Sequence, residues 1–266
     1  MKPPILLVGA GRMGAAMLEG WLAQGLAPIV AVEPNPSPRL KKLGVRVLAQ
    51  IPSGKVRACV VALKPQILRT EAARLRPIAE SGAPMISIAA GTSIATLKKA
   101  WGAKAHMLRA MPNTPGAIGR GITAIFQGPN ATAADCKLAE ALLKPLGPTI
   151  WVAKEKLIDV TTAVSGSGPA YVFLLVEALA DAAEAQGMPR AEAEQLARAT
   201  ITGAGALLDA DPRPPAELRR DVTSPGGTTE AALKVLIGSK PPKGGLNGLM
   251  ARAVAAANKR AGELAS

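Results

Sequence analysis

The chain has 266 residues, of which 48% are hydrophobic and 19% are charged, with 27 glycines and 23 prolines. This length and composition are typical of one large or two modest globular domains, and they exclude a disordered or fibrous chain. The formal net charge is +13, but aromatic residues make up only 2%, so a basic surface that attracts small anions explains the charge better than nucleic-acid binding does.

The first part of the chain alternates short apolar runs with helical segments, which predicts an α/β fold with a Rossmann-like, doubly wound parallel sheet. The near-continuous apolar character of the runs is expected for strands that helices cover on both faces. The predicted strands are Ile5–Val8, Ile29–Val32, 58–63, 85–89, 106–110, 122–126 and 149–152. The predicted helices between them are 14–24, 67–79, 92–100 and Ala133–Leu143.

Beyond residue 152 the sequence changes to long segments rich in Ala, Leu and Glu, and no further strand is predicted. The predicted helices here are 170–186, 190–208, 228–236 and 248–261. We therefore expect two domains. Residues 1–152 are expected to form a dinucleotide-binding Rossmann domain, and residues 153–266 an all-helical domain for substrate binding and dimerisation.

The predicted helix over residues 171–183 is apolar almost all round, broken only by Glu177 and Asp181. A helix of this kind is buried on every side. A helical domain of this size can hardly enclose it alone, so we expect a dimer or a larger homo-oligomer. The alternative is a central helix of a monomeric bundle.

A glycine loop, residues 9–14, follows the first predicted strand directly and precedes a helix. It fits the pattern G-x-G-x-x-G, in which the glycines allow a tight turn, approach of a pyrophosphate and close packing of helix on strand. The helix start offers free N–H groups and a positive dipole to the phosphates. The residues expected to bind the dinucleotide here are Val8, Gly9, Ala10, Gly11, Arg12, Met13 and Gly14.

Glu33 ends the second predicted strand, about 20 residues beyond the glycine loop. A carboxylate at this place accepts hydrogen bonds from the adenosine ribose and repels a 2′-phosphate, which favours NAD. Because Arg39, Lys41 and Lys42 lie close by in the sequence and Arg12 lies in the glycine loop itself, NADP stays open. The alternative for Glu33 is a solvated residue that opens a turn.

Five further stretches carry distinctive residue patterns: Val61-Ala62-Leu63-Lys64-Pro65, Ala89-Ala90-Gly91, Arg109-Ala110-Met111-Pro112-Asn113-Thr114-Pro115, Ser165-Gly166-Ser167-Gly168-Pro169-Ala170-Tyr171 and Asp221-Val222-Thr223-Ser224-Pro225-Gly226-Gly227-Thr228-Thr229. The last two of them are far more specific than the glycine loop. Together the five stretches resemble one family, the pyrroline-5-carboxylate reductases, and the likeness runs from about Ile5 to Leu264.

The resemblance implies an oxidoreductase of proline biosynthesis, which reduces 1-pyrroline-5-carboxylate to L-proline with NADPH or NADH. The cytoplasmic location that we expect comes instead from the apolar runs, which are too short for a secretory signal or a membrane span. It also implies further cofactor contacts at the carboxyl ends of the strands, where ligands bind in an open parallel sheet. These contacts are Ala62, Leu63, Lys64, Pro65, Ala89 and Ala90, with Asn113 near the nicotinamide. The alternatives are a rim lysine for Lys64 and a turn former for Asn113.

The loop before the predicted helix 228–236 combines two glycines with a helix start, which suits a bound carboxylate. The resemblance places the substrate carboxylate there and Thr229 beside the ring nitrogen as the catalytic residue. The implied substrate-binding residues are Ser224, Gly226, Gly227, Thr228 and Thr229. The alternative is that Thr228 or Thr229 only caps the helix.

A cyclic imine is basic enough to arrive protonated, so its reduction needs positioning more than a strong acid. In keeping with this, His106, the only histidine, is expected to be structural, and Tyr171 is expected to pack rather than to donate a proton. The sequence shows no pattern of metal ligands around Cys59, Cys136 or elsewhere. We therefore expect no metal, and no secretory signal or membrane span is predicted.

Two other classes share part of this pattern. A β-hydroxyacid dehydrogenase has the same architecture, but places a catalytic lysine on the first helix after the sheet, and residues 165–187 contain none. A dinucleotide sensor without catalysis would keep the glycine loop but would not need the loop at residues 224–229. Both comparisons favour an imine reductase.

Overall fold

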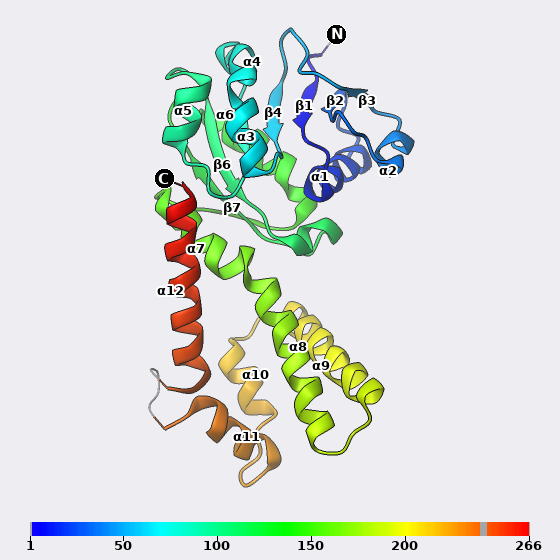
Figure 1. The fold of residues 1–266 in the computed structure, drawn as a ribbon, viewed down its shortest axis with the longest axis vertical. Helices are drawn as coiled ribbons and strands as arrows, with labels where there is room; N and C mark the ends of the chain where they lie inside the picture. Colours follow the sequence, from blue (N-terminus) through cyan, green and yellow to red (C-terminus); the bar gives the residue numbers. More distant parts are fainter. Residues whose placement is uncertain (1, 240–243, 266) are drawn as a thin grey trace. The chain divides into compact units, whose positions relative to one another are not determined.

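The computed structural model describes residues 2–239 and 244–265 of the chain. They form two compact units, Met1–Ser167 with Ala257–Ser266, and Gly168–Ala256. The boundary after the sheet therefore lies at residue 167, beyond the expected residue 152, and the end of the chain returns to the first unit. Figure 1 shows the sheet and its helices in the first unit and an all-helical second unit.

The first unit contains an eight-stranded sheet in the order β3-β2-β1-β4-β5-β6-β7-β8. The chain winds outward from β1 through β2 to β3 and then returns to β4 on the other side of β1. The carboxyl ends of β1 and β4 therefore form a topological switch point, where such sheets bind ligands. The strands are β1 Ile5–Val8, β2 Ile29–Val32, β3 Arg46–Leu48, β4 Ala58–Val61, β5 Met85–Ser87, β6 Met107–Met111, β7 Thr123–Gln127 and β8 Thr149–Trp151.

The sheet is parallel from β3 to β6, but β7 runs antiparallel to β6 and β8 runs parallel to β7. The predicted doubly wound parallel sheet is confirmed as a mostly parallel sheet, and β7 and β8 run against the other strands. Parallel neighbours need a long crossover, whereas antiparallel ones accept a short connection. Here only the short 3-10 helix η2 (Thr114–Ile118) lies between β6 and β7, so β7 turns back along β6.

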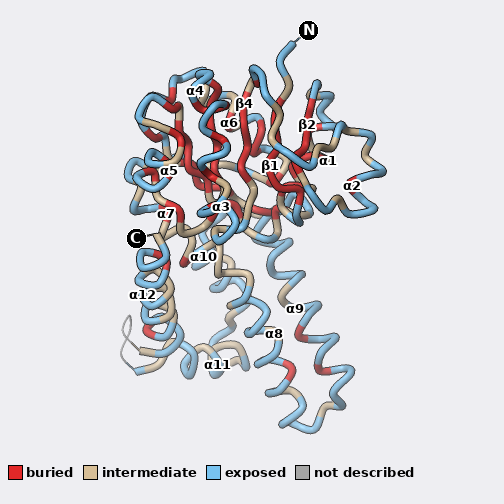
Figure 2. Tube along the Cα trace, turned by 45° about the horizontal axis from the view of Figure 1, so that its top comes forward, coloured by how far each residue is buried: buried red, intermediate tan, exposed pale blue. Residues whose placement is uncertain are grey.

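Helices cover both faces of the sheet, as the apolar runs predict. Alternate residues of β1 enter different cores: Leu6 and Val8 belong to one, Ile5 and Leu7 to the other. Figure 2 shows the strands as the most deeply buried part of the chain. The elements that flank the sheet are α1 Arg12–Ala23, α2 Pro38–Lys42, α3 Pro65–Glu71, η1 Ala72–Leu75, α4 Arg76–Glu80, α5 Ile94–Trp101, α6 Ala133–Leu143 and η3 Lys144–Leu146.

A buried ion cluster attaches the next helix, α7 (Lys156–Thr161), to the sheet. Arg109 on β6 is 2% exposed, and its guanidinium donates to Glu155 at 3.0 Å and to Asp159 at 3.2 Å. Glu155 also accepts the backbone N–H of Ile94 at 2.7 Å. A buried charge that loses its partner is costly, so this cluster holds α7 in the first unit and explains the position of the boundary.

The second unit consists of α8 (Gly168–Ala185), α9 (Arg190–Ala210), α10 (Pro215–Asp221), α11 (Thr228–Ile237) and most of α12 (Gly245–Ala265). Its buried core is small and is centred on Ala180, Ala193 and Ala197. Large apolar side chains of α8 stay open, with Phe173 62% and Leu174 63% exposed. Such a surface is typical of a protein interface.

One helical stretch among the described residues, Lys156–Ala185, is long and apolar enough to cross a membrane by length and composition. This criterion is weak, because an apolar helix that another subunit covers meets it as well. The stretch also contains a π-helical turn, η4 (Thr162–Gly166), and such turns are frequent at functional sites.

Candidate functional site

The glycine loop has the backbone that its three glycines predict. Gly9 has a φ of 91°, where side chains are strained. A Cβ on Gly14 would lie 2.2 Å from the carbonyl oxygen of Gly9, so only glycine fits there. A Cβ on Gly11 would meet nothing within 4 Å. The space beside Gly11 is therefore open to a ligand, as the approach of a pyrophosphate requires.

Helix α1 begins directly at this opening. Its N-cap is Gly11, which supplies no side-chain hydrogen bond, and no acidic residue lies in its first turn. The N–H groups and the positive end of the helix dipole are thus left for an external anion. Arg12 is exposed and Met13 half-buried at the same place. The loop fits the pyrophosphate of a dinucleotide.

Glu33, at the end of β2, is held by two backbone groups. Its Oε2 accepts the N–H of Ala10 at 3.0 Å, and its Oε1 accepts the N–H of Asn35 at 3.2 Å. The carboxylate therefore bridges the glycine loop and the turn after β2, rather than lying free in solvent. Because each carboxylate oxygen can accept a second hydrogen bond, Glu33 can still accept from a ribose hydroxyl.

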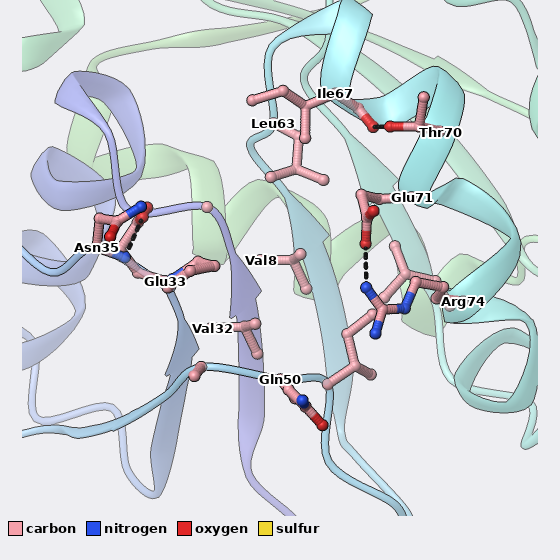
Figure 3. A pocket seen from close by; sticks show the side chains of 15 residues that line it. Val8, Val32, Glu33, Asn35, Gln50, Leu63, Ile67, Thr70, Glu71 and Arg74 are labelled. Carbon is pink, nitrogen blue, oxygen red and sulfur yellow. Dashed lines mark hydrogen bonds and ion pairs between the residues drawn. The ribbon is translucent and has the colours of Figure 1, made fainter.

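A pocket of about 380 Å³ opens at the switch point, beside Glu33 (Figure 3). Val8 of β1, Val32 of β2 and Leu63 after β4 lie on its walls, and Arg74 of η1 lies on the wall opposite Glu33. Its size and its largely apolar walls suit a small-molecule site. Together with the glycine loop, this pocket fits the adenosine end of a dinucleotide.

The other expected cofactor residues also lie where parallel strands end. Ala62, Leu63, Lys64 and Pro65 follow β4, and Lys64 is the exposed N-cap of α3. Ala89 and Ala90 follow β5. Lys64 is thus exposed where β4 ends, and both its interpretations, cofactor contact and rim lysine, stay predictions.

Asn113 follows β6, and its side chain is part of the fold. Its Oδ1 accepts the N–H of Ile122 at 3.0 Å, which closes the connection to β7. A carboxamide whose oxygen is used in this way presents its NH₂ group as a donor. Asn113 is therefore a turn former whose donor can still serve a ligand.

The substrate loop, residues 224–229, forms a tight turn into α11. Pro225 and Gly226 occupy its centre, Gly226 has a φ of 73°, and Gly227 N–H donates to Ser224 O at 3.0 Å. This is the residue pattern of a type II turn. The N-cap of α11 is Gly227, so the interpretation of Thr228 or Thr229 as the helix cap is wrong.

Glu230 fills part of the expected anion site. Its carboxylate accepts the N–H of Gly226 at 2.5 Å and pairs with Lys234 at 3.1 Å. These contacts, the Gly226 bond first, lower the pKa of Glu230 below its usual value of 4.5. With Gly226 and Gly227 engaged, the N–H groups of Thr228 and Thr229 in the first helical turn are left for a ligand. The sequence carried a signal for this contact, a glutamate at the third helical position.

The remaining candidates have structural partners. His106 Nδ1 lies 2.8 Å from Asp135 Oδ2, and Asp135 forms the capping box of α6 with Thr132. The hydrogen bonds of Asp135 to the Thr132 backbone and to His106 outweigh partial burial and lower its pKa. Residues 2–239 and 244–265 contain no group of three or more His, Cys, Asp or Glu that could hold a metal.

A glycine loop that admits a pyrophosphate, followed by an acid and a pocket at the switch point, defines a dinucleotide-binding protein of the Rossmann class. The sequence family described as pyrroline-5-carboxylate reductase dimerisation matches residues 155–264. The pyrroline-5-carboxylate reductase of Pisum sativum is 38% identical to this chain, over 97% of this chain and 94% of its own length. That of Pseudomonas aeruginosa is 37% identical, over 99% of this chain and 97% of its own length. The chain belongs to the pyrroline-5-carboxylate reductase family.

Solved structures agree with this assignment. A pyrroline-5-carboxylate reductase from Coxiella burnetii superposes with a TM-score of 0.90 at 34% identity, and each chain is covered completely. The Plasmodium falciparum enzyme with NADP bound gives 0.80 at 26% identity, over 99% of this chain and 98% of that one. The doubly wound fold and the family resemblance are thus confirmed, and the chain is an oxidoreductase that forms homo-oligomers.

Proposed function

We propose that this chain reduces 1-pyrroline-5-carboxylate to L-proline, the final step of proline biosynthesis, with NADPH or NADH as hydride donor. The observation that supports this most is a family match over almost the whole chain. When bound, the dinucleotide would supply a hydride to the imine carbon and become oxidised. Because the cyclic imine arrives protonated, its nitrogen would keep that proton while the π pair of the C=N bond becomes the nitrogen lone pair.

In this proposal the first unit holds the cofactor. The open backbone at Gly11 and the start of α1 bind the pyrophosphate, and the pocket beside Glu33 holds the adenosine. The loops after β4 and β5 line the cofactor further along the strand ends. The NH₂ group of Asn113 is the donor that we assign to the nicotinamide side, because its oxygen is committed to Ile122.

The second unit holds the substrate through the start of α11. We assign the substrate carboxylate to the N–H groups of Thr228 and Thr229, since no intrahelical acceptor is available to the first turn of a helix. Ser224, Gly226 and Gly227 shape the turn that presents these groups. The Thr229 hydroxyl then contacts the ring nitrogen and fixes the imine carbon for hydride transfer.

The proposal also covers the oligomeric state of the protein and its location in the cell. The open apolar side chains of α8, such as Phe173 and Leu174, lie within the region matched by the dimerisation family, so we assign them to contacts between copies of the chain. We propose a soluble, cytoplasmic enzyme with a small-molecule substrate, with no nucleic-acid or membrane partner and no metal.

The test is steady-state oxidation of NADPH and NADH with 1-pyrroline-5-carboxylate, beside the reverse reaction with a panel of 3-hydroxyacids and oxidised cofactor. Saturable turnover of the imine and background rates with every hydroxyacid are expected. Turnover of a hydroxyacid without turnover of the imine would contradict the proposal.

A further inference from the structure

The wall of the adenosine pocket opposite Glu33 carries an ion pair, between Arg74 of η1 and Glu71 at the end of α3. Arg74 Nη1 lies 2.7 Å from Glu71 Oε2 (Figure 3). Arg74 is the only cation among the residues that line this pocket, all of which lie in the described part of the chain. The side chains are 60% and 37% exposed, so both can be reached from the pocket opening.

The charges around the pocket oppose a second phosphate. Glu33 and Glu71 are acidic, Arg74 is basic, and no other charged residue lines the pocket, which leaves a net charge of one negative unit. NADP differs from NAD by a 2′-phosphate on the adenosine ribose, which adds about two negative charges near neutral pH. Such a group is bound by an arginine that is available to it, and here the guanidinium is already paired with a carboxylate.

A second arginine near the end of β2 is held in the same way. Arg39 of α2 donates to both carboxylate oxygens of Glu19 of α1, at 2.5 and 2.6 Å. Lys41 and Lys42 of the same short helix do not line the pocket. Arg74 on the pocket wall and Arg39 on the helix after β2 therefore each carry a glutamate partner.

We propose that Glu71 is a specificity-determining residue: it holds Arg74 away from a 2′-phosphate, so that this chain favours NADH over NADPH. The inference rests on the proposed function, in which this pocket takes the adenosine. It adds a second determinant to Glu33, on the opposite wall and on a different element.

The experiment measures dissociation constants of the full-length protein for 5′-AMP and 2′,5′-ADP by calorimetry, and for NADH and NADPH by cofactor fluorescence. The variants are Glu71→Gln, Arg74→Leu and the double variant. Glu80→Gln is the matched control, since Glu80 pairs with Arg76 at 3.1 Å on the exposed surface of α4 outside the pocket.

Glu71→Gln is expected to tighten the binding of 2′,5′-ADP and NADPH about 1.5- to 5-fold, the scale of one exposed charge pair, and to leave the binding of 5′-AMP and NADH almost unchanged. The gain is expected to shrink at high salt and to vanish in the double variant. Glu80→Gln is expected to change none of the four constants.

Three results would overturn the inference. Glu71→Gln could change the dissociation constants of 5′-AMP and 2′,5′-ADP equally, or change neither of them. The tighter binding of 2′,5′-ADP could also persist in the double variant, which lacks Arg74. Equal weakening of both mononucleotides in Arg74→Leu would also overturn it, because Arg74 would then serve the adenine ring instead. In each case intact imine turnover would leave the proposed function standing. A wild-type protein that binds no 5′-AMP would refute the adenosine pocket and the inference together.

Discussion

Replacing Thr229 tests the substrate loop most sharply, because the structure separates catalysis from stability at this residue. Thr229 lies at the second position of α11, whose N-cap is Gly227. No hydrogen bond of its hydroxyl is found within residues 2–239 and 244–265. Thr229→Ala therefore removes no side-chain hydrogen bond found in the described part of the chain, and the melting temperature is expected to change little.

Catalysis is expected to change much more. Loss of one positioned hydrogen bond to the ring nitrogen lowers kcat/KM for the imine about 10- to 100-fold, or roughly 1.5–3 kcal/mol. Thr229→Val, which keeps the shape but not the hydroxyl, is expected to fall as far, whereas Thr229→Ser retains most of the activity. Cofactor affinity is expected to stay within about twofold in all three.

The assay is steady-state kinetics with the imine as varied substrate, accompanied by thermal melts and cofactor titration. Equal losses in the alanine and serine variants would refute the role of the hydroxyl. So would a fall in melting temperature large enough to account for the lost activity, because Thr229 would then act only in the fold.

Three further changes probe other parts of the account. Glu33→Ser removes the acid beside the ribose and the acceptor of Ala10 N–H. The ratio of kcat/KM for NADPH to that for NADH should therefore rise, and the melting temperature should fall. An unchanged ratio would show that Glu33 only stabilises the glycine loop. Leu175→Arg places a charge on the apolar face of α8 and should give aggregated protein instead of a stable monomer, which sedimentation at micromolar concentration checks. The pKa of Glu230 is lowered in the fold. The carboxylate therefore stabilises the folded state fully at pH values above its usual pKa of 4.5, and this stabilisation is lost as the pH falls through the lower pKa of the folded state. Melting temperatures from pH 7 to 3 should therefore drop less steeply for Glu230→Gln than for the wild type.

Much of the fold could be predicted because its strands are continuous apolar runs. Ile5–Val8 and Ile29–Val32 agree residue for residue with β1 and β2. The edge strand β3 was missed, since Arg46-Val47-Leu48 is short and has one exposed residue and two half-buried ones. The helix predicted over 67–79 is divided into α3, η1 and α4; Pro77, which lacks an N–H donor, lies in the first turn of α4.

Some features of the candidate site could be predicted from the sequence, and others depend on contacts that form only in the fold. The glycine loop follows from local backbone demands, so its conformation could be predicted from sequence alone. The contact between Glu33 and Ala10 N–H joins the end of β2 to the glycine loop, 23 residues apart in the sequence, and only the folded sheet defines it. In the sequence, the Glu71–Arg74 pair resembles any surface ion pair on a helix. Its proposed role in cofactor choice could not be predicted, because only the folded chain places η1 beside the switch point.

The most direct measurement of the central claim follows the hydride itself. The wild-type enzyme is given unlabelled 1-pyrroline-5-carboxylate with NADH or NADPH that carries deuterium at the transferable position of nicotinamide C4, and the product is analysed by mass spectrometry and NMR. The expected product is L-proline with one deuterium, on the ring carbon that was the imine carbon, in amounts equal to the cofactor oxidised. Cofactor oxidation without labelled proline, or proline without deuterium at that carbon, would contradict the central claim.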